Sequence, residues 1–286
     1  MSMEMSIRHD IEVIRQNLNM TLDEFAEFFG LGVSTLARYE NGGLEIPSHV
    51  ADQILSYGYQ KGIRLNRIKA LIAKEKIGNS GKLLFHGSKT GIVGDVSVEK
   101  GESNKDFGKA FYLGESVEQA TSFVSSYPSS KLYLFQYSGG AKEVTFGFDI
   151  DWVIAICYYR GYLKPYENHP LVKAVIEKIE EADVVIAPIA DNQMFDTMRE
   201  FADGLITDVV CVHCLSASDL GMQYVFRNDK AIKDKLELIG ESAICRAEKE
   251  ALASLKRQSA ADNLEKKKIV MREYRTQGKF VEDIFK

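Results

Sequence analysis

The chain has 286 residues, 45% of them hydrophobic and 27% charged, a size that favours more than one domain and a composition that excludes a disordered or collagen-like protein. No apolar run approaches the roughly 18 residues that a membrane-spanning helix needs, and the N-terminus lacks the layout of a signal peptide. Four scattered cysteines are too few for a disulfide scaffold. We therefore expect a cytoplasmic protein that does not use a membrane.

The formal net charge of −5 is unevenly distributed along the chain. Residues 1–76 carry 9 basic and 10 acidic side chains, residues 77–240 carry 16 and 23, and residues 241–286 carry 11 and 8. Nucleic-acid affinity depends mainly on Lys and Arg that neutralise phosphates. The acidic middle of the chain is therefore a poor nonspecific binder of DNA or RNA, and any such binding is left to the two ends.

The first 77 residues predict a run of short helices. Thr21 is a good N-cap, with Glu24 three residues later as its capping-box partner. The helix that follows stops at Gly30, where glycine allows a tight exit. Another helix begins at Val33 and ends at Asn41. Two short helices joined by about four residues are typical of a helix-turn-helix.

Roughly the first 65 residues resemble the lambda-repressor-like, or Xre, family. The likeness rests on Ala26, on Leu31 and on the run Arg38-Tyr39-Glu40-Asn41-Gly42. It implies that residues 21–42 bind a DNA operator, with contacts in the major groove from Ser34, Thr35 and Arg38. Such proteins commonly dimerise to match two half-sites, so a homodimer is one option, and the oligomeric state stays open at this point.

The charge of this segment leaves a second interpretation open. Its net charge is −1, and its basic cluster follows the motif instead of lying within it. The alternative is a helical module that packs against its neighbour or mediates dimers. The cluster consists of Lys61, Arg64, Arg67, Lys69, Lys74 and Lys76.

A linker is expected at residues 78–81, and a second domain after it. Strands are predicted over residues 82–86, after a turn in 106–114, and over 131–138, 143–148, 183–188 and 222–227. Helices are predicted over residues 117–125, 149–160, 171–182 and 195–205, with a short one ending at Leu238, while residues 207–216 are ambiguous. Clustered strands with helices between them, without a regular alternation, indicate an α+β fold.

The second domain contains no common motif for phosphate binding, zinc-dependent hydrolysis or a serine nucleophile. Cys211, His213 and Cys214 lack a fourth ligand at the usual spacing, so no metal is expected. His86, Tyr112 and Gln223 each lie on a predicted strand next to a glycine or a turn. This is the pattern of side chains presented to a cleft.

Several segments together resemble the poly(ADP-ribose) polymerase branch of the ADP-ribosyltransferases, nearest to a bacterial branch. They are His86-Gly87-Ser88, Gly108-Lys109-Ala110-Phe111-Tyr112, an aromatic residue eleven positions later at Phe123, and Gln223-Tyr224-Val225-Phe226. Further shared features are Asp106-Phe107-Gly108, Trp152, Arg160 and residues 184–195. The resemblance covers about residues 82–240 and implies a split β-sandwich that uses NAD as co-substrate.

The resemblance also implies roles for these residues. The catalytic set is His86, Tyr112 and Gln223, a His-Tyr-Gln variant of the family's His-Tyr-Glu triad. His86 would hydrogen-bond a ribose hydroxyl, and the Gly87 backbone, within the His86-Gly87-Ser88 strand, would pair with the nicotinamide amide. Tyr112 would stack on the nicotinamide ring, and Phe123 would cover its other side.

Two departures from the family pattern bear on activity. Gln223 can hold a ribose 2′-hydroxyl, but it cannot carry the charge that stabilises an oxocarbenium ion or act as a base, which argues against poly(ADP-ribose) chains. Glu115 or Glu118 is the alternative carboxylate, although both are expected to face solvent. Ala120 replaces a serine that donates to the nicotinamide amide. Asp191 is interpreted as part of a loop at the mouth of the site or as a helix cap, with the loop favoured.

Residues 241–286 predict a helical tail. Its basic run at residues 266–268 is interpreted as a contact for nucleic acid or an acidic partner, or as a solvated face. The apolar end of the tail indicates docking onto a partner or onto the acidic central domain. The end consists of Phe280, Val281, Ile284 and Phe285.

The sequence thus predicts an all-α helix-turn-helix domain (residues 1–77), an α+β ADP-ribosyltransferase-like domain (78–240) and the helical tail (241–286). The leading hypothesis is an NAD-dependent mono-ADP-ribosyltransferase that modifies a macromolecule, with protein favoured, as in a toxin or defence effector that regulates its own expression. A second is a DNA-binding transcription regulator that binds NAD or ADP-ribose without catalysis. A third is an NAD glycohydrolase.

Overall fold

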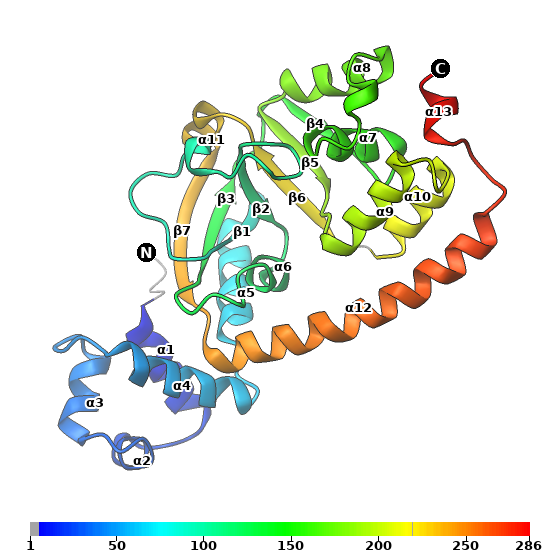
Figure 1. The fold of residues 1–286 in the computed structure, drawn as a ribbon. Helices are drawn as coiled ribbons and strands as arrows, with labels where there is room; N and C mark the ends of the chain where they lie inside the picture. Colours follow the sequence, from blue (N-terminus) through cyan, green and yellow to red (C-terminus); the bar gives the residue numbers. More distant parts are fainter. Residues whose placement is uncertain (1–5, 219) are drawn as a thin grey trace. The chain divides into compact units, whose positions relative to one another are not determined.

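The computed structural model describes residues 6–218 and 220–286, and the elements are labelled in Figure 1. The chain divides into two compact units. The first unit contains the chain up to Gly91 together with residues 116–137 and 237–255. The second unit contains residues 92–115, 138–236 and 256–286. The predicted domain limits at residues 77 and 240 stay a prediction.

The helices at the start of the first unit confirm the predicted run of short helices. They pack around fully buried side chains of Ile11, Ile14, Phe25, Leu36 and Ile54. This core supplies most of their stability, because helices of 7 to 13 residues are marginal on their own. The helices are α1 (Ile7–Asn17), α2 (Leu22–Phe28), α3 (Val33–Glu40), α4 (Ser48–Gln60) and α5 (Leu65–Ile77).

Local signals fix the turn between α2 and α3. Thr21 and Glu24 form the predicted capping box at the start of α2. Gly30 ends that helix with a φ of 65°, a left-handed conformation that favours glycine. The Leu31 N–H then donates to the carbonyl oxygen of Ala26 at 2.8 Å. The chain therefore turns within a few residues and starts α3 at Val33.

Three strands belong to the first unit and pair in the order β1-β3-β7: β1 (Lys82–Ser88), β3 (Lys131–Tyr137) and β7 (Leu236–Ala243). The predicted short helix is observed as α11 (Asp229–Lys235), but its expected end at Leu238 is wrong, because β7 begins at Leu236. The sequence Leu236–Ala243 contains two glutamates and a glycine and half of its residues are exposed, so it lacks the apolar run that predicts a strand.

The short helix α6 (Val117–Ser122) packs with the β1–β3 pair in the first unit. Its cap is Ser116, which forms a capping box with Gln119. The shared core contains Phe85, Leu132 and Leu134 from the strands and Val117, Ala120 and Val124 from the α6 segment. One face of β1 is therefore closed by a helix.

The second unit is built on four strands that pair in the order β4-β5-β6-β2: β4 (Glu143–Thr145), β5 (Val184–Pro188), β6 (Met222–Phe226) and β2 (Phe111–Gly114). The β4–β5 pair is parallel, whereas β5–β6 and β6–β2 are antiparallel. The helices include α7 (Ile150–Tyr159), α8 (Pro170–Glu180), α9 (Asn192–Ala202) and α10 (Asp208–Ser216), with short 3₁₀ turns at Val98–Lys100 and Lys164–Tyr166. The mixed pairing confirms an α+β arrangement.

Two uncertain parts of the second unit prove to be helical. Residues 207–216 contain α10, capped by Thr207 and buried through Val210 and Leu215. Asp191 accepts hydrogen bonds from the N–H groups of Gln193 and Met194, both at 3.0 Å, and so caps α9. The loop interpretation of Asp191 is therefore wrong, and the cap is the observed arrangement.

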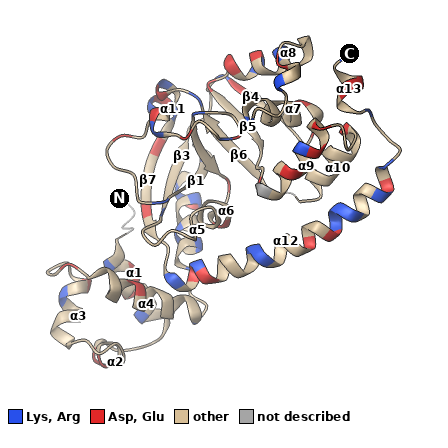
Figure 2. Cartoon of the chain, in the orientation of Figure 1, with Lys and Arg blue, Asp and Glu red and all other residues tan. Residues whose placement is uncertain are grey.

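The C-terminal part is helical, as predicted. The long helix α12 (Arg246–Tyr274) supplies residues to both units, and Figure 2 shows basic and acidic residues interspersed along it. The short helix α13 (Val281–Ile284) follows. Val281 and Phe285 are buried in the core of the second unit, where Phe285 stacks on Tyr166 with ring centroids 4.8 Å apart. The apolar end therefore docks within the chain.

No helix in the described residues is both long and apolar enough to cross a membrane.

Candidate functional site

The predicted DNA contacts lie at the start and along the exposed side of α3. Ser34 and Arg38 are exposed, and Thr35 is partly exposed. An ion pair holds the far end of the helix, since Arg15 on α1 donates from Nε and Nη2 to the two carboxylate oxygens of Glu40 at 2.8 and 2.9 Å. The structure thus presents all three predicted residues on one short, anchored helix.

The basic cluster after the motif is partly used inside the first unit. Lys69 is buried, and its Nζ donates to Asp10 Oδ2 at 2.7 Å and to Ser242 Oγ at 2.8 Å. Arg67 pairs with Glu118. The Arg64 guanidinium lies 3.8 Å from the ring centroid of Tyr59. The exposed Lys61 lies with its Nζ 5.2 Å from the ring centroid of Tyr57, so four of the six cations have partners, while Lys74 and Lys76 are exposed.

The β1–β3 pair separates the residues of the predicted His86-Gly87-Ser88 segment onto two faces. His86 lies opposite Tyr133, and Ser88 lies opposite Lys131. Side chains alternate along a strand, so His86 and Ser88 share one face and Gly87 belongs to the other. The role of Gly87 in the resemblance needs only its backbone, so this alternation is compatible with it.

Gly87 also has a structural reason to be glycine. A Cβ atom at this position would lie 2.1 Å from the Ala120 carbonyl oxygen and 2.9 Å from Val124 Cγ2. The backbone of α6 can therefore approach β1 only because residue 87 has no side chain. Ala120, which replaces the family's serine, is buried in this contact, whereas Phe123 at the end of α6 is 51% exposed.

The structure brings Tyr112 and Gln223 together in the second unit. Strands β2 and β6 pair antiparallel, with Tyr112 opposite Val225 and Gly114 opposite Gln223. Residues two apart on a strand share a face, so Tyr112 and Gln223 are diagonal neighbours on one face of the pair. Of the predicted catalytic set, Tyr112 and Gln223 therefore belong to the second unit, whereas His86 belongs to the first.

The Tyr112 hydroxyl is fully engaged by the segment that precedes its strand. It donates to the Gly108 carbonyl oxygen at 2.7 Å and accepts from the Phe107 N–H at 3.1 Å. Burial raises the pKa of Tyr112 well above that of an exposed tyrosine. The hydroxyl therefore stays neutral and serves to hold residues 107 and 108, while the partly buried ring packs against the hydrophobic core of the second unit.

Gln223 is the centre of a buried polar group. It is 6% exposed, and its Nε2 donates to Asp106 Oδ2 at 3.2 Å and to the Pro188 carbonyl oxygen at 3.0 Å. None of the described residues donates to its carboxamide oxygen Oε1. A buried amide that satisfies both of its N–H groups and not its oxygen is ready to accept a hydrogen bond from a ligand.

Asp106 holds this group in place. It is 7% exposed, and its Oδ1 accepts from Arg160 Nη2 at 2.7 Å. Burial raises the pKa of Asp106, while Arg160 and Gln223 act in the opposite direction. The Arg160 guanidinium also lies 3.8 Å from the ring centroid of Phe195. Arg160 is therefore fixed on both sides.

The carboxylate beside Gln223 is one that sequence reasoning did not single out. The predicted alternative carboxylate, Glu118, belongs to the first unit and pairs there with Arg67. Asp106 lies 117 positions before Gln223 in the sequence, and it was noted only as one residue of a shared segment. The property that would have identified Asp106 is the burial of its side chain. The burial of a single aspartate cannot be predicted from the residues next to it in the sequence.

The cysteine-rich turn of α10 has packing partners in the second unit. His213 stacks on Tyr274 with ring centroids 3.9 Å apart, and Cys214 Sγ lies 3.9 Å from the Lys267 carbonyl oxygen. Burial raises the pKa of Cys214 to about 11 and also holds the pKa of Cys211 well above its usual value. Both thiols are therefore protonated at neutral pH. The described residues contain no group of three or more His, Cys, Asp or Glu placed to bind a metal ion.

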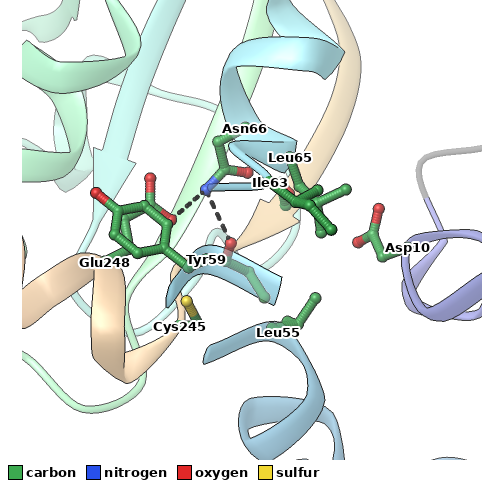
Figure 3. A pocket seen from close by; sticks show the side chains of 10 residues that line it. Asp10, Leu55, Tyr59, Ile63, Leu65, Asn66, Cys245 and Glu248 are labelled. Atoms are coloured by element: carbon green, nitrogen blue, oxygen red, sulfur yellow. Dashed lines mark hydrogen bonds between the residues drawn. The ribbon is translucent and has the colours of Figure 1, made fainter. Parts of the chain in front are cut away.

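A small pocket in the first unit was not anticipated from the sequence, and Figure 3 shows its lining. Asn66 Nδ2 donates to the Ala243 carbonyl oxygen at 3.1 Å and to Glu248 Oε2 at 2.8 Å, while Asn66 Oδ1 is completely buried with no partner among the described residues. Burial raises the pKa of Glu248 to about 7. The pocket is lined by Asp10, Leu55, Tyr59, Ile63, Leu65, Asn66, Ser242, Ala243, Cys245 and Glu248.

The contacts beside this pocket identify it as a structural joint. The first N–H groups of α12 are capped by α4, since Arg246 N donates to Asp52 Oδ1 at 2.8 Å and Ala247 N to Ser56 Oγ at 3.2 Å. Free N–H groups at a helix start need such partners. The pocket therefore lies where the helix-turn-helix segment attaches to the start of α12.

Comparison with protein families gives two matches, which cover separate regions of the chain. Residues 11–57 match the family model described as helix-turn-helix, which indicates a DNA-binding domain. Residues 83–238 match the model described as protein of unknown function (DUF3990), and the chain belongs to this family. No curated protein and no solved structure matches the chain. Because the DUF3990 description states no activity, it leaves the reaction of the α+β region to be proposed.

Proposed function

We propose that the chain is a DNA-binding protein whose α+β region is an NAD-dependent mono-ADP-ribosyltransferase acting on a macromolecule, with protein as the favoured acceptor. The observation that carries the proposal is the shared face of Tyr112 and Gln223, where Gln223 is 6% exposed and no described residue donates to its carboxamide oxygen. An acceptor that no protein group occupies can take a hydrogen bond from a ligand. A ribose hydroxyl of NAD supplies the missing donor.

The residue types fit cleavage of the nicotinamide–ribose bond. That bond breaks through an oxocarbenium-like ribose, so an enzyme gains most by holding the ribose hydroxyls and orienting the nicotinamide. Gln223 offers an acceptor for a hydroxyl, and the Tyr112 ring offers a flat surface for the nicotinamide. His86 on β1 enters the proposal through the family resemblance, as the residue that binds a ribose hydroxyl of the adenosine half.

The test is consumption of NAD by the purified protein, followed by mass spectrometry of nicotinamide, free ADP-ribose and modified macromolecules. We expect nicotinamide release together with a macromolecule heavier by one ADP-ribose unit, and loss of both in His86→Ala and Tyr112→Ala. His49→Ala, which removes an exposed histidine from α4, is the matched control and keeps wild-type turnover. Unchanged NAD turnover in both site variants would contradict the proposal.

A specific observation favours a second candidate, a transcription regulator that binds NAD or ADP-ribose without cleaving it. Position 223 carries no charge, and the charge of the neighbouring Asp106 is paired with Arg160. The same experiment separates the candidates. Saturable NAD binding without nicotinamide release supports the regulator, whereas release of free ADP-ribose alone identifies an NAD glycohydrolase.

The DNA-binding part of the proposal has its own test. The probe is the DNA upstream of the protein's own coding sequence, because an effector that controls its own expression binds there. We expect Arg38→Ala to weaken specific binding about tenfold, as loss of a base contact does. Arg199→Ala, which removes an exposed arginine from α9, should leave the affinity unchanged. Equal affinities of wild type and Arg38→Ala would place the DNA contacts elsewhere.

A further inference from the structure

We propose that Asp106 is a positioning residue, which with the Pro188 carbonyl orients the Gln223 carboxamide so that Oε1 accepts a ribose hydroxyl of NAD. The same proposal explains why residue 223 is glutamine, since aspartate at position 106 needs a hydrogen-bond donor there. The inference rests on the NAD-dependent function proposed above. It adds a residue that the resemblance does not assign and a reason for glutamine at a position where the family has glutamate.

The first step is the orientation of the amide. Both N–H groups of Gln223 Nε2 have acceptors, Asp106 Oδ2 at 3.2 Å and the Pro188 carbonyl oxygen at 3.0 Å. Turning the amide by half a rotation would place Oε1 against these two oxygens, with the loss of both hydrogen bonds. Only one orientation is therefore favourable, and it leaves Oε1 as the free acceptor.

The second step is the rigidity of Asp106. Both of its carboxylate oxygens accept hydrogen bonds, Oδ1 from Arg160 and Oδ2 from Gln223. This is the pattern of an ionised carboxylate, because a protonated oxygen would have to donate. The guanidinium of Arg160 is in turn stacked on Phe195. Gln223 is thus oriented by a partner that cannot turn away.

The third step concerns glutamate. A carboxylate at position 223 would face the Asp106 carboxylate and the Pro188 carbonyl at hydrogen-bond distance with no proton between them. Two carboxylates that share a site cannot both ionise without a large cost. The glutamine is therefore required by Asp106, and the reverse pair, asparagine at 106 with glutamate at 223, restores a donor and an acceptor.

The experiment is a double-mutant cycle on the full-length protein, with nicotinamide release as the readout for kcat and KM of NAD. The variants are Gln223→Glu, Asp106→Asn and the two combined. We expect Gln223→Glu to raise KM at least about tenfold near neutral pH, and less in mild acid where the pair shares a proton. Asp106→Asn raises KM about three- to tenfold, the loss expected for one hydrogen bond. Asp151→Asn, at an aspartate of α7 whose side chain is 41% exposed, is the control with wild-type constants.

Rescue separates positioning from a merely structural role. The double variant should have a lower KM than Gln223→Glu, although not the wild-type value, because the Pro188 carbonyl has lost its donor. If Gln223→Glu is too unstable for kinetics, recovery of its melting temperature by Asp106→Asn is the same rescue. A double variant no better than Gln223→Glu in KM and in melting temperature would overturn the inference alone. A wild-type protein that neither binds nor cleaves NAD would overturn the proposed function, and this inference with it.

Discussion

Two buried amides, Asn66 in the first unit and Gln223 in the second, make the same pair of hydrogen bonds. Each donates through its nitrogen to one carboxylate oxygen and one backbone carbonyl oxygen. Each also has an oxygen that no described residue satisfies. A buried, half-satisfied amide is therefore not by itself the mark of a functional site.

The carboxylates beside the two amides differ. Asp106 has a counter-ion, with Arg160 Nη2 at 2.7 Å, whereas Glu248 forms no ion pair with any described residue. Burial without a counter-ion raises the pKa of Glu248 to about 7, and the charges of Arg64 and Arg67 only partly oppose it. The cluster around Gln223 is thus a fixed arrangement, and the one around Asn66 changes protonation near neutral pH.

The largest expected effect on stability comes from removing Arg160, the counter-ion of Asp106. Arg160→Met should destabilise the protein by about 3 kcal/mol in denaturant titration, because Asp106 would remain buried with its charge uncompensated. Adding Asp106→Asn should recover part of the loss. The matched control is Lys178→Met, which breaks an ion pair whose side chains are 55% and 41% exposed and should cost less than about 1 kcal/mol. Equal losses in the two variants would show that Arg160 does not compensate a buried charge.

The helix-turn-helix was predictable because its determinants are local. The Thr21–Glu24 capping box and the Gly30 exit each depend on residues within a few positions, and both were expected and observed. The same holds for the strands that contain His86, Tyr112 and Gln223, whose apolar runs are continuous. These elements therefore followed from short stretches of sequence, which contain caps and a glycine for the helices and apolar residues for the strands.

The sites depend on contacts that no window of sequence contains. Asn66 and Glu248 are 182 positions apart, and Asp106 and Gln223 are 117 apart. The missed strand β7 has a different cause, since half of its residues are exposed and its sequence contains Glu237, Gly240 and Glu241 instead of an apolar run. The sequence could name Gln223 as a candidate, but only the fold shows which carboxylate lies beside it.

The second prediction concerns the group without a counter-ion. The unfolded chain ionises Glu248 near its ordinary pKa of 4.5, whereas the folded chain holds the proton up to about pH 7. Between these values the folded state binds more protons, so its stability falls as pH rises and is constant above about 7. Glu248→Gln keeps the acceptor for Asn66 and removes the titration. It should stabilise the protein at neutral pH by about 2 to 3 kcal/mol and flatten this part of the stability profile.

Thermal unfolding of wild type and Glu248→Gln at several pH values measures this difference. Glu250→Gln, an exposed residue of the same helix, is the control and should follow the wild-type profile. Parallel profiles for wild type and Glu248→Gln would mean that Glu248 is ionised in the folded state. In that case Glu248 would be a buried ionised carboxylate like Asp106, and the two clusters would not differ in protonation.

The smallest effect tests which amide serves a ligand. Asn66→Ala removes two hydrogen bonds at the joint between α5 and the start of α12, and should cost about 1 to 2 kcal/mol of stability. It should leave KM for NAD unchanged, because Asn66 Oδ1 is completely buried and serves no substrate. Gln223→Ala should raise KM about tenfold, since a ribose hydroxyl loses its acceptor. If both variants changed KM alike, the two amides would be functionally equivalent, and the counter-ion of Asp106 would not be what distinguishes the site.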